Sequence, residues 1–128
     1  MKDGHLPTIT SLLLILLVTF HLADDIVRGY EAGGLANLMA LPILVVWLYG
    51  ALLLRERRSG YVITLLASVL SLAVPYFHMK GKGLAFQVAT SPSGGFFFVW
   101  TIIALGVVGL FSIVLSARGL WRLRRTSQ

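Results

Sequence analysis

The sequence predicts an all-α fold: a four-helix transmembrane bundle in which residues 1–128 form a single integral membrane domain with both termini in the cytoplasm. The first reason is composition, because 57% of the residues are hydrophobic and only 12% are charged, whereas soluble domains are about 45–50% apolar and about 25% charged. A soluble chain this short could not bury so much apolar surface in one core. The other two reasons are four long apolar segments and an uneven distribution of Lys and Arg between them.

The four apolar segments have the length of membrane-spanning helices, for which roughly 20 residues suffice. In lipid the backbone must satisfy its own hydrogen bonds, which favours helices. The short alternating runs that are typical of membrane β-barrels are absent from the sequence. The expected helices cover about residues 8–28, 35–54, 61–79 and 96–118.

The first segment is the shortest, because its apolar part ends at residue 23 and a full span requires the helix to continue through Asp24 and Asp25 towards Arg28. An alternative is a cleaved signal peptide, since the start of the chain is weakly charged and the apolar run is compact. Against cleavage, the candidate stretch "HLA" places a histidine where a small residue is required. We therefore expect a retained helix.

Orientation follows from the basic residues, which concentrate in cytoplasmic loops of membrane proteins. In a four-span chain the amino terminus, the loop "RERRSG" and the carboxyl-terminal tail lie on one side. That side carries eight basic residues and the other carries three, which predicts a cytoplasmic location for both termini. The eight are Lys2, Arg55, Arg57, Arg58, Arg118, Arg122, Arg124 and Arg125, and the three are Arg28, Lys80 and Lys82.

Aromatic residues near the segment ends are expected to lie at the two membrane interfaces. They are Trp47, Tyr49 and Trp121 on the cytoplasmic side and Phe96, Phe97, Phe98 and Trp100 on the outer side. The hairpin "RERRSG" makes the second and third helices antiparallel neighbours. The long outer connection "KGKGLAFQVATSPSGG" contains "LAFQVAT", which alternates enough to predict a short strand or an interfacial turn.

Two rows of small and hydroxyl-bearing residues recur at helical spacing in the third and fourth segments. Small residues let membrane helices approach closely, so we interpret the rows as helix-packing seams, within one bundle or between copies. A polar path for a substrate is the alternative, although such hydroxyls usually bond to nearby backbone. The rows are Thr64, Ser68 and Ser71, followed by Pro75, and Gly109, Ser112 and Ser116, with Gly106 beside them.

The stretch "FHLADDIVRGYE" holds the candidate site: an outer-face polar cluster of His21, Asp24, Asp25 and Arg28, joined by His78 from the end of the third helix. The residues of the first helix are three and four apart and share one broad face. The simplest interpretation is a set of interfacial ion pairs, in which the carboxylates, including Glu31, pair with Arg28, Lys80 and Lys82 and anchor the first helix to the third.

The same cluster suggests three functional alternatives. His21 and His78 with Asp24 or Asp25 form a donor set that suits zinc, manganese or iron. His21 and His78 alone are candidate axial ligands of a b-type haem. Carboxylates close to a bilayer also exchange protons or cations, as in proton-coupled transport.

Other chemistry lacks its motifs. The chain has no cysteine, which excludes disulfides and thiolate sites, and it contains no phosphate-binding loop, no Gly-x-Ser-x-Gly and no His-Glu-x-x-His. Small multidrug-resistance transporters are similar in size, but the glutamate of their first helix is missing from "LLLILLVTF". Vitamin K epoxide reductases are similar four-helix membrane proteins, but their chemistry needs paired cysteines and this chain has none.

The sequence thus favours a non-enzymatic membrane component, an accessory subunit or homo-oligomer of a bacterial inner membrane. Its expected partners are the lipid bilayer and another membrane protein or a second copy, with no nucleic acid and no cofactor. The alternative is a small transporter or a ligand-, metal- or haem-binding membrane protein that uses the outer cluster. A membrane enzyme with a metal centre at His21, Asp24, Asp25 and His78 comes third.

Overall fold

The computed structural model describes residues 5–80 and 94–126 of the chain. Of these residues 88% are helical and none is in a strand. The prediction of an all-α fold with four helices long and apolar enough to cross a membrane is confirmed. The helices are α1 (His5–Val27), α2 (Ala40–Leu52) with a preceding 3₁₀ turn η1 (Leu35–Met39), α3 (Arg58–Lys80) and α5 (Gly95–Thr126).

The helix ends have local causes. Helix α1 stops where Gly29 adopts a left-handed backbone with φ of 77°, which is a common way to terminate a helix. Pro42 lies in the first turn of α2, where a missing backbone N–H costs little, and Pro75 lies inside α3. Helix α5 extends to Thr126, eight residues beyond the expected end at 118. The stretch "LAFQVAT", residues 84–90, lies outside the described residues.

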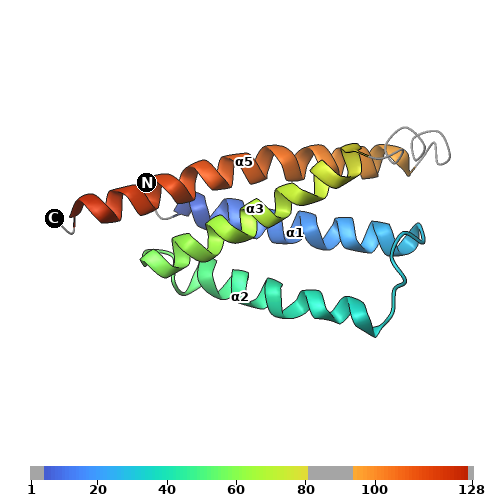
Figure 1. The fold of residues 1–128 in the computed structure, drawn as a ribbon, viewed down its shortest axis with the longest axis horizontal. Coiled ribbons are helices and arrows are strands. Elements are labelled where there is room, and N and C mark those ends of the chain that lie inside the picture. Colours follow the sequence, from blue (N-terminus) through green and yellow to red (C-terminus); the bar gives the residue numbers. More distant parts are fainter. Residues whose placement is uncertain (1–4, 81–93, 127–128) are drawn as a thin grey trace.

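Successive helices run in opposite directions, so that the start of α1, the α2–α3 hairpin and the end of α5 lie at one end of the bundle (Figure 1). We call this the arginine-rich end, because it carries Arg55, Arg57, Arg58, Arg118, Arg122, Arg124 and Arg125. The opposite end, formed by the ends of α1 and α3 and the start of α5, carries His21 and His78, and we call it the histidine end. Helix α5 packs mainly on α3 and α1, whereas α2 packs on α3 and α1 and, within the described residues, not on α5.

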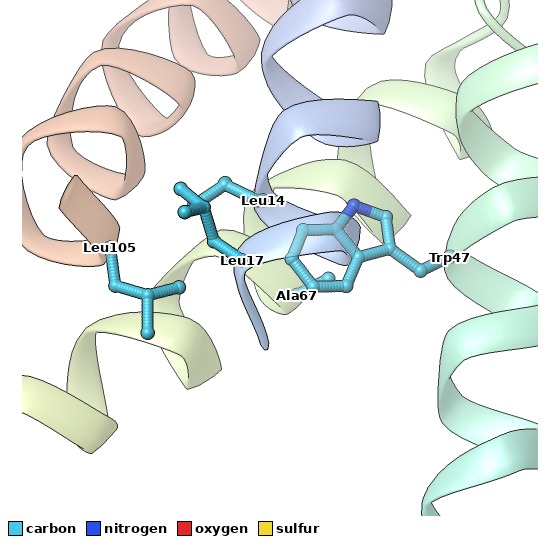
Figure 2. Packing of buried hydrophobic residues seen from close by; sticks show 5 residues of the cluster. All are labelled: Leu14, Leu17, Trp47, Ala67 and Leu105. Carbon is cyan, nitrogen blue, oxygen red and sulfur yellow. The ribbon is translucent and has the colours of Figure 1, made fainter. Parts of the chain in front are cut away.

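All four helices contribute to a small apolar core in the middle of the bundle, shown in Figure 2. It consists of Leu14, Leu17, Trp47, Ala67 and Leu105. Trp47 is only 3% exposed, so its predicted place in an interfacial belt is wrong. It lies more than one helical turn before the end of α2 and faces α1 and α3, where its ring fills the space between the helices.

The outside of the bundle is strongly apolar. Large aliphatic and aromatic side chains of every helix are exposed, including Ile9, Val45, Leu70 and Val107, each by more than half of its surface. Soluble monomers rarely expose so much contiguous apolar surface. A surrounding bilayer explains it, because the outer helix faces then contact lipid rather than water.

The small and hydroxyl-bearing residues lie on the contact between α3 and α5. The Ser68 hydroxyl bonds to the Thr64 carbonyl at 2.7 Å and shares a hydrogen bond of 2.8 Å with Ser112. Ser71 bonds back to the Ser68 carbonyl at 2.8 Å. A Cβ added at Gly109 would come within 2.9 Å of Leu72. These contacts bring the two backbones together inside one chain.

Two members of the rows behave differently from the rest. Gly106 is half-buried, and an added Cβ there would meet nothing within 4 Å. Ser116 is fully buried and its hydroxyl has no hydrogen-bond partner among the described residues. The α3–α5 seam therefore depends on Thr64, Ser68, Ser71, Gly109 and Ser112, while self-association through it remains a prediction.

Candidate functional site

The candidate site lies at the histidine end, where α1 and α3 run side by side in the same direction. His21 and Asp25 are four residues apart on α1 and therefore share a face one above the other. His78 is in the last turn of α3. The two helices approach each other at this level, so that residues separated by 57 positions in the sequence come into contact.

Three donor atoms of the site lie close together. His21 Nε2 is 3.2 Å from His78 Nε2 and 3.3 Å from Asp25 Oδ2. His78 Nε2 is 3.8 Å from the same carboxylate oxygen. The two imidazole rings meet edge to face, with centroids 4.9 Å apart and planes at 89°. The three atoms form a compact triangle that is small enough for one metal ion to contact all three.

The triangle is mostly shielded from solvent. His21 and Asp25 are 5% and 8% exposed, and the side chain of His78 is 25% exposed. Two buried atoms, His21 Nδ1 and Asp25 Oδ1, have no hydrogen-bond partner within residues 5–80 and 94–126. An unpaired polar atom away from water costs about 1–3 kcal/mol, and more for a charged group. Such a site gains stability from any ligand that neutralises the carboxylate.

Asp24 does not join the triangle, because it pairs with Arg28. The guanidinium Nε donates to Asp24 Oδ2 at 2.8 Å, and both side chains are 11% exposed. Arg28 also donates through Nη2 to the Gly94 carbonyl, at the start of α5. Through Arg28 the pair connects the end of α1 to the start of α5. Because the Asp24 carboxylate is bound to Arg28, Asp25 is the carboxylate that faces the histidines.

Phe98 of α5 closes the site from the third side. It is fully buried, and its ring centroid lies 5.8 Å from that of His21 and 5.3 Å from that of His78. The Arg28 guanidinium lies 5.7 Å from the same ring. Aromatic packing on both imidazoles restricts their orientation and keeps water away from that face.

The predicted cluster is thus divided by the structure. His21, Asp25 and His78 form the triangle. Asp24 pairs with Arg28, as the ion-pair interpretation expected, but the pair lies within α1 and contacts the start of α5 rather than the third helix. Glu31 is exposed beyond the end of α1. The Lys80 side chain and all of Lys82 lie outside the described part of the chain.

Two residues of the site, Phe98 and Gly94, were not predicted from the sequence, and Phe98 was expected in an interfacial belt. Phe98 is buried between α1 and α3, so its predicted interfacial place is wrong. Its spacing in α5 contains a signal for this: Phe98, Thr101, Leu105, Gly109 and Ser112 recur every three or four residues and are all buried. That period marks one inward face of a helix. Gly94 carries no such signal, because only its carbonyl takes part.

The dimensions of the triangle fit a transition metal. Zinc binds histidine nitrogen at about 2.0–2.1 Å and carboxylate oxygen at about 2.0–2.2 Å, which places two ligands of a tetrahedral ion about 3.3–3.5 Å apart. The observed separations are 3.2, 3.3 and 3.8 Å. Two histidines and one carboxylate are the donors of open-sided iron(II) and zinc sites, in which further positions remain for water or substrate.

A haem fits the same residues poorly. Axial ligands hold haem iron from opposite faces of the porphyrin. The His21 and His78 nitrogens are within hydrogen-bonding distance at 3.2 Å, and Asp25 lies beside them, so no macrocycle can lie between the rings in this arrangement.

Comparison with known proteins adds no functional assignment: no protein-family model, no curated protein and no solved structure matches this chain. The site must be interpreted from its own geometry.

Proposed function

We propose that this protein is a small integral membrane protein that binds one divalent transition-metal ion at the histidine end of its bundle. His21 and His78 supply Nε2 and Asp25 supplies a carboxylate oxygen. The donor set suits Zn²⁺, Fe²⁺ or Mn²⁺. The observation that carries the proposal is the buried triangle of donor atoms, 3.2–3.8 Å apart, contributed by two different helices.

Burial strengthens the proposal. A carboxylate that is 8% exposed, with one oxygen lacking a partner among the described residues, is stabilised by a positive charge nearby. Arg28 is engaged by Asp24 and the Gly94 carbonyl. A metal ion would supply that charge and tie α1 to α3 at the same time.

The orientation proposed from the basic residues gives the site a location. With both termini in the cytoplasm, the histidine end faces the outside of the membrane, which we take to be a bacterial inner membrane. The quarter-exposed His78 then offers the ion an approach from the outer surface. Three protein ligands leave coordination positions open for an exchangeable molecule.

An accessory role without metal is the second candidate function. It is favoured by the direct His21–His78 and His21–Asp25 contacts, which also form a hydrogen-bonded network that ties α1 to α3. In that case the exposed apolar faces of the helices carry the function, by contact with another membrane protein or with a second copy.

Metal analysis separates the two functions. The full-length protein, purified in mild detergent and stripped with a chelator, is titrated with Co²⁺ while its visible ligand-field absorption is recorded. We expect one ion per chain for the wild type and none for His78→Ala. The matched control is His5→Ala, since His5 is exposed at the opposite end, and it should bind Co²⁺ as the wild type does. If the wild type absorbs no more than His78→Ala, the metal function is wrong and the accessory role remains.

A further inference from the structure

A groove at the arginine-rich end lies between the first turns of α3 and the last turns of α5. Its volume is about 310 Å³. Helix α3 lines it with Arg58, Val62 and Leu65, and α5 lines it with Leu120, Trp121 and Arg124 among others. The groove is far from the metal triangle and nothing in the proposed function uses it.

Helix geometry puts the two arginines of this groove at the same end. Arg58, Val62 and Leu65 are four and three residues apart, so they form one stripe along α3. Leu120, Trp121 and Arg124 form a matching stripe along α5. Because α3 and α5 are antiparallel, Arg58 at the start of one and Arg124 near the end of the other both lie at the mouth. The apolar residues continue from there towards the middle of the bundle.

The charges at this end are unbalanced. Among the described residues of the arginine-rich end, the only acidic side chain is Glu56, which lies 3.9 Å from Arg55. Arg58 and Arg124 form no ion pair with any residue in 5–80 or 94–126. Two guanidinium groups at the mouth of one groove therefore attract an anion, and Arg is well suited to bind phosphate oxygens.

Trp121 indicates the depth of the groove in the membrane. It is 58% exposed, and the Arg125 guanidinium lies 4.0 Å from the centre of its ring. Tryptophan and arginine side chains of this kind are typical of the headgroup level, where one part of the residue is apolar and the other is wet. The mouth then lies among headgroups and the apolar floor among acyl chains.

We propose that this groove binds an anionic phospholipid of the adjacent leaflet. The phosphate lies between Arg58 and Arg124, and one acyl chain follows the apolar floor formed by Val62, Leu65 and Leu120. Basic pockets between transmembrane helices on the cytoplasmic side are sites of this kind. A soluble phosphate would leave the apolar floor of the groove uncovered. A second copy of the chain that docked through the same groove would place its arginines against those of the first, and like charges repel.

Native mass spectrometry of the full-length protein, released from mild detergent, tests the proposal. The probes are dioleoyl phosphatidylglycerol and, as the zwitterionic match, dioleoyl phosphatidylcholine. We expect the wild type to retain the anionic lipid selectively. The double variant Arg58→Gln, Arg124→Gln should lose affinity for it by roughly 25- to 30-fold, about fivefold for each arginine, with phosphatidylcholine binding unchanged.

The control variant loses the same number of positive charges, but at two arginines outside the groove. Arg55→Gln, Arg57→Gln removes two positive charges from the neighbouring hairpin, and we expect a loss of less than about threefold because neither arginine lines the groove and exposed charges are screened by salt. Ala117 of α5 also lines the groove. Ala117→Trp therefore fills the groove while both arginines remain, and it should also remove lipid selectivity. Circular dichroism of each variant verifies that the helices are retained.

Three results would overturn the proposal. The first is equal retention of the two lipids by the wild type. The second is an equal loss in both double variants, since that would assign the effect to net charge alone. The third is full displacement of the lipid by glycerol 3-phosphate or by formation of a dimer, since the groove would then take a soluble anion or a second copy. None of these outcomes depends on whether the histidine end binds a metal.

Discussion

The two ends of this bundle treat charged side chains in opposite ways. At the histidine end Asp24, Asp25 and Arg28 are largely buried and contact one another or the histidines. At the arginine-rich end the guanidinium groups of Arg58 and Arg124 are exposed and have no carboxylate partner within the described residues. Burial forces a charge to find a partner inside the protein, whereas exposure leaves it for the surroundings. The first end is thus suited to a small ion and the second to an anionic surface.

Substituting each of the two aspartates tests most directly whether the histidine end binds a metal ion. We expect Asp25→Asn to reduce Co²⁺ affinity by at least about a hundredfold, because it removes a ligand. Even the substitution of a residue that only supports a ligand lowers metal affinity by about 10- to 100-fold. Asp24→Asn changes the same charge one residue away and should cost only a few-fold. Co²⁺ titration measures both. A larger loss in Asp24→Asn would mean that Asp24 is the ligand and that its ion pair with Arg28 separates when the metal binds.

Acidification should release the metal ion from the histidine end and leave lipid binding at the arginine-rich end unchanged. Histidine binds metal through a neutral imidazole, so protons and the metal compete for the same nitrogen. Co²⁺ affinity therefore falls as pH falls. Titrations at several pH values measure the slope. Phosphatidylglycerol binding, which depends on arginines, should be constant over that range, and a flat Co²⁺ affinity would contradict a site built from two histidines.

The ion pairs of the two ends should differ in strength. Arg28 and Asp24 are 2.8 Å apart and nine-tenths buried, while Arg55 and Glu56 are 3.9 Å apart and exposed. We expect Arg28→Ala to lower the free energy of unfolding by about 2–4 kcal/mol, because it leaves a buried carboxylate unpaired. Arg55→Ala should change it by about 0–1 kcal/mol. Thermal unfolding in one detergent compares them, and equal effects would show that burial does not distinguish the ends.

Two glycines of α5 give the smallest expected effects and test how this helix packs on its neighbours. A Cβ at Gly119 would lie 2.2 Å from the Tyr61 ring, whereas one at Gly106 would meet nothing within 4 Å. We expect Gly119→Ala to destabilise the protein by about 1–3 kcal/mol through overpacking. Gly106→Ala should stabilise it by about 0.5–1 kcal/mol, since alanine is the better helix former. The same unfolding assay measures both, and a harmless Gly119→Ala would indicate that Tyr61 moves freely.

Much of the site was accessible from the sequence because helices impose local geometry. The four-residue spacing of His21 and Asp25, and of Asp24 and Arg28, places each pair on one face of any helix that contains them. The antiparallel order of the segments brought His78 to the same end. Which aspartate faces the histidines was left open, because adjacent residues point about 100° apart on a helix and only packing fixes the rotation.

The sequence alone determined the class of this protein. Its apolar run lengths require helices that can cross a membrane, since lipid offers no other partner for backbone groups, and its basic residues divide the chain into two unlike ends. The tertiary structure decided the rest: the 3.2 Å contact between His21 and His78, the choice of Asp25 over Asp24, and the burial of Trp47 and Phe98. These depend on helix rotation and register, which are set by side chains such as Leu14, Ala67 and Leu105 fitting together across the core. No local pattern contains that information.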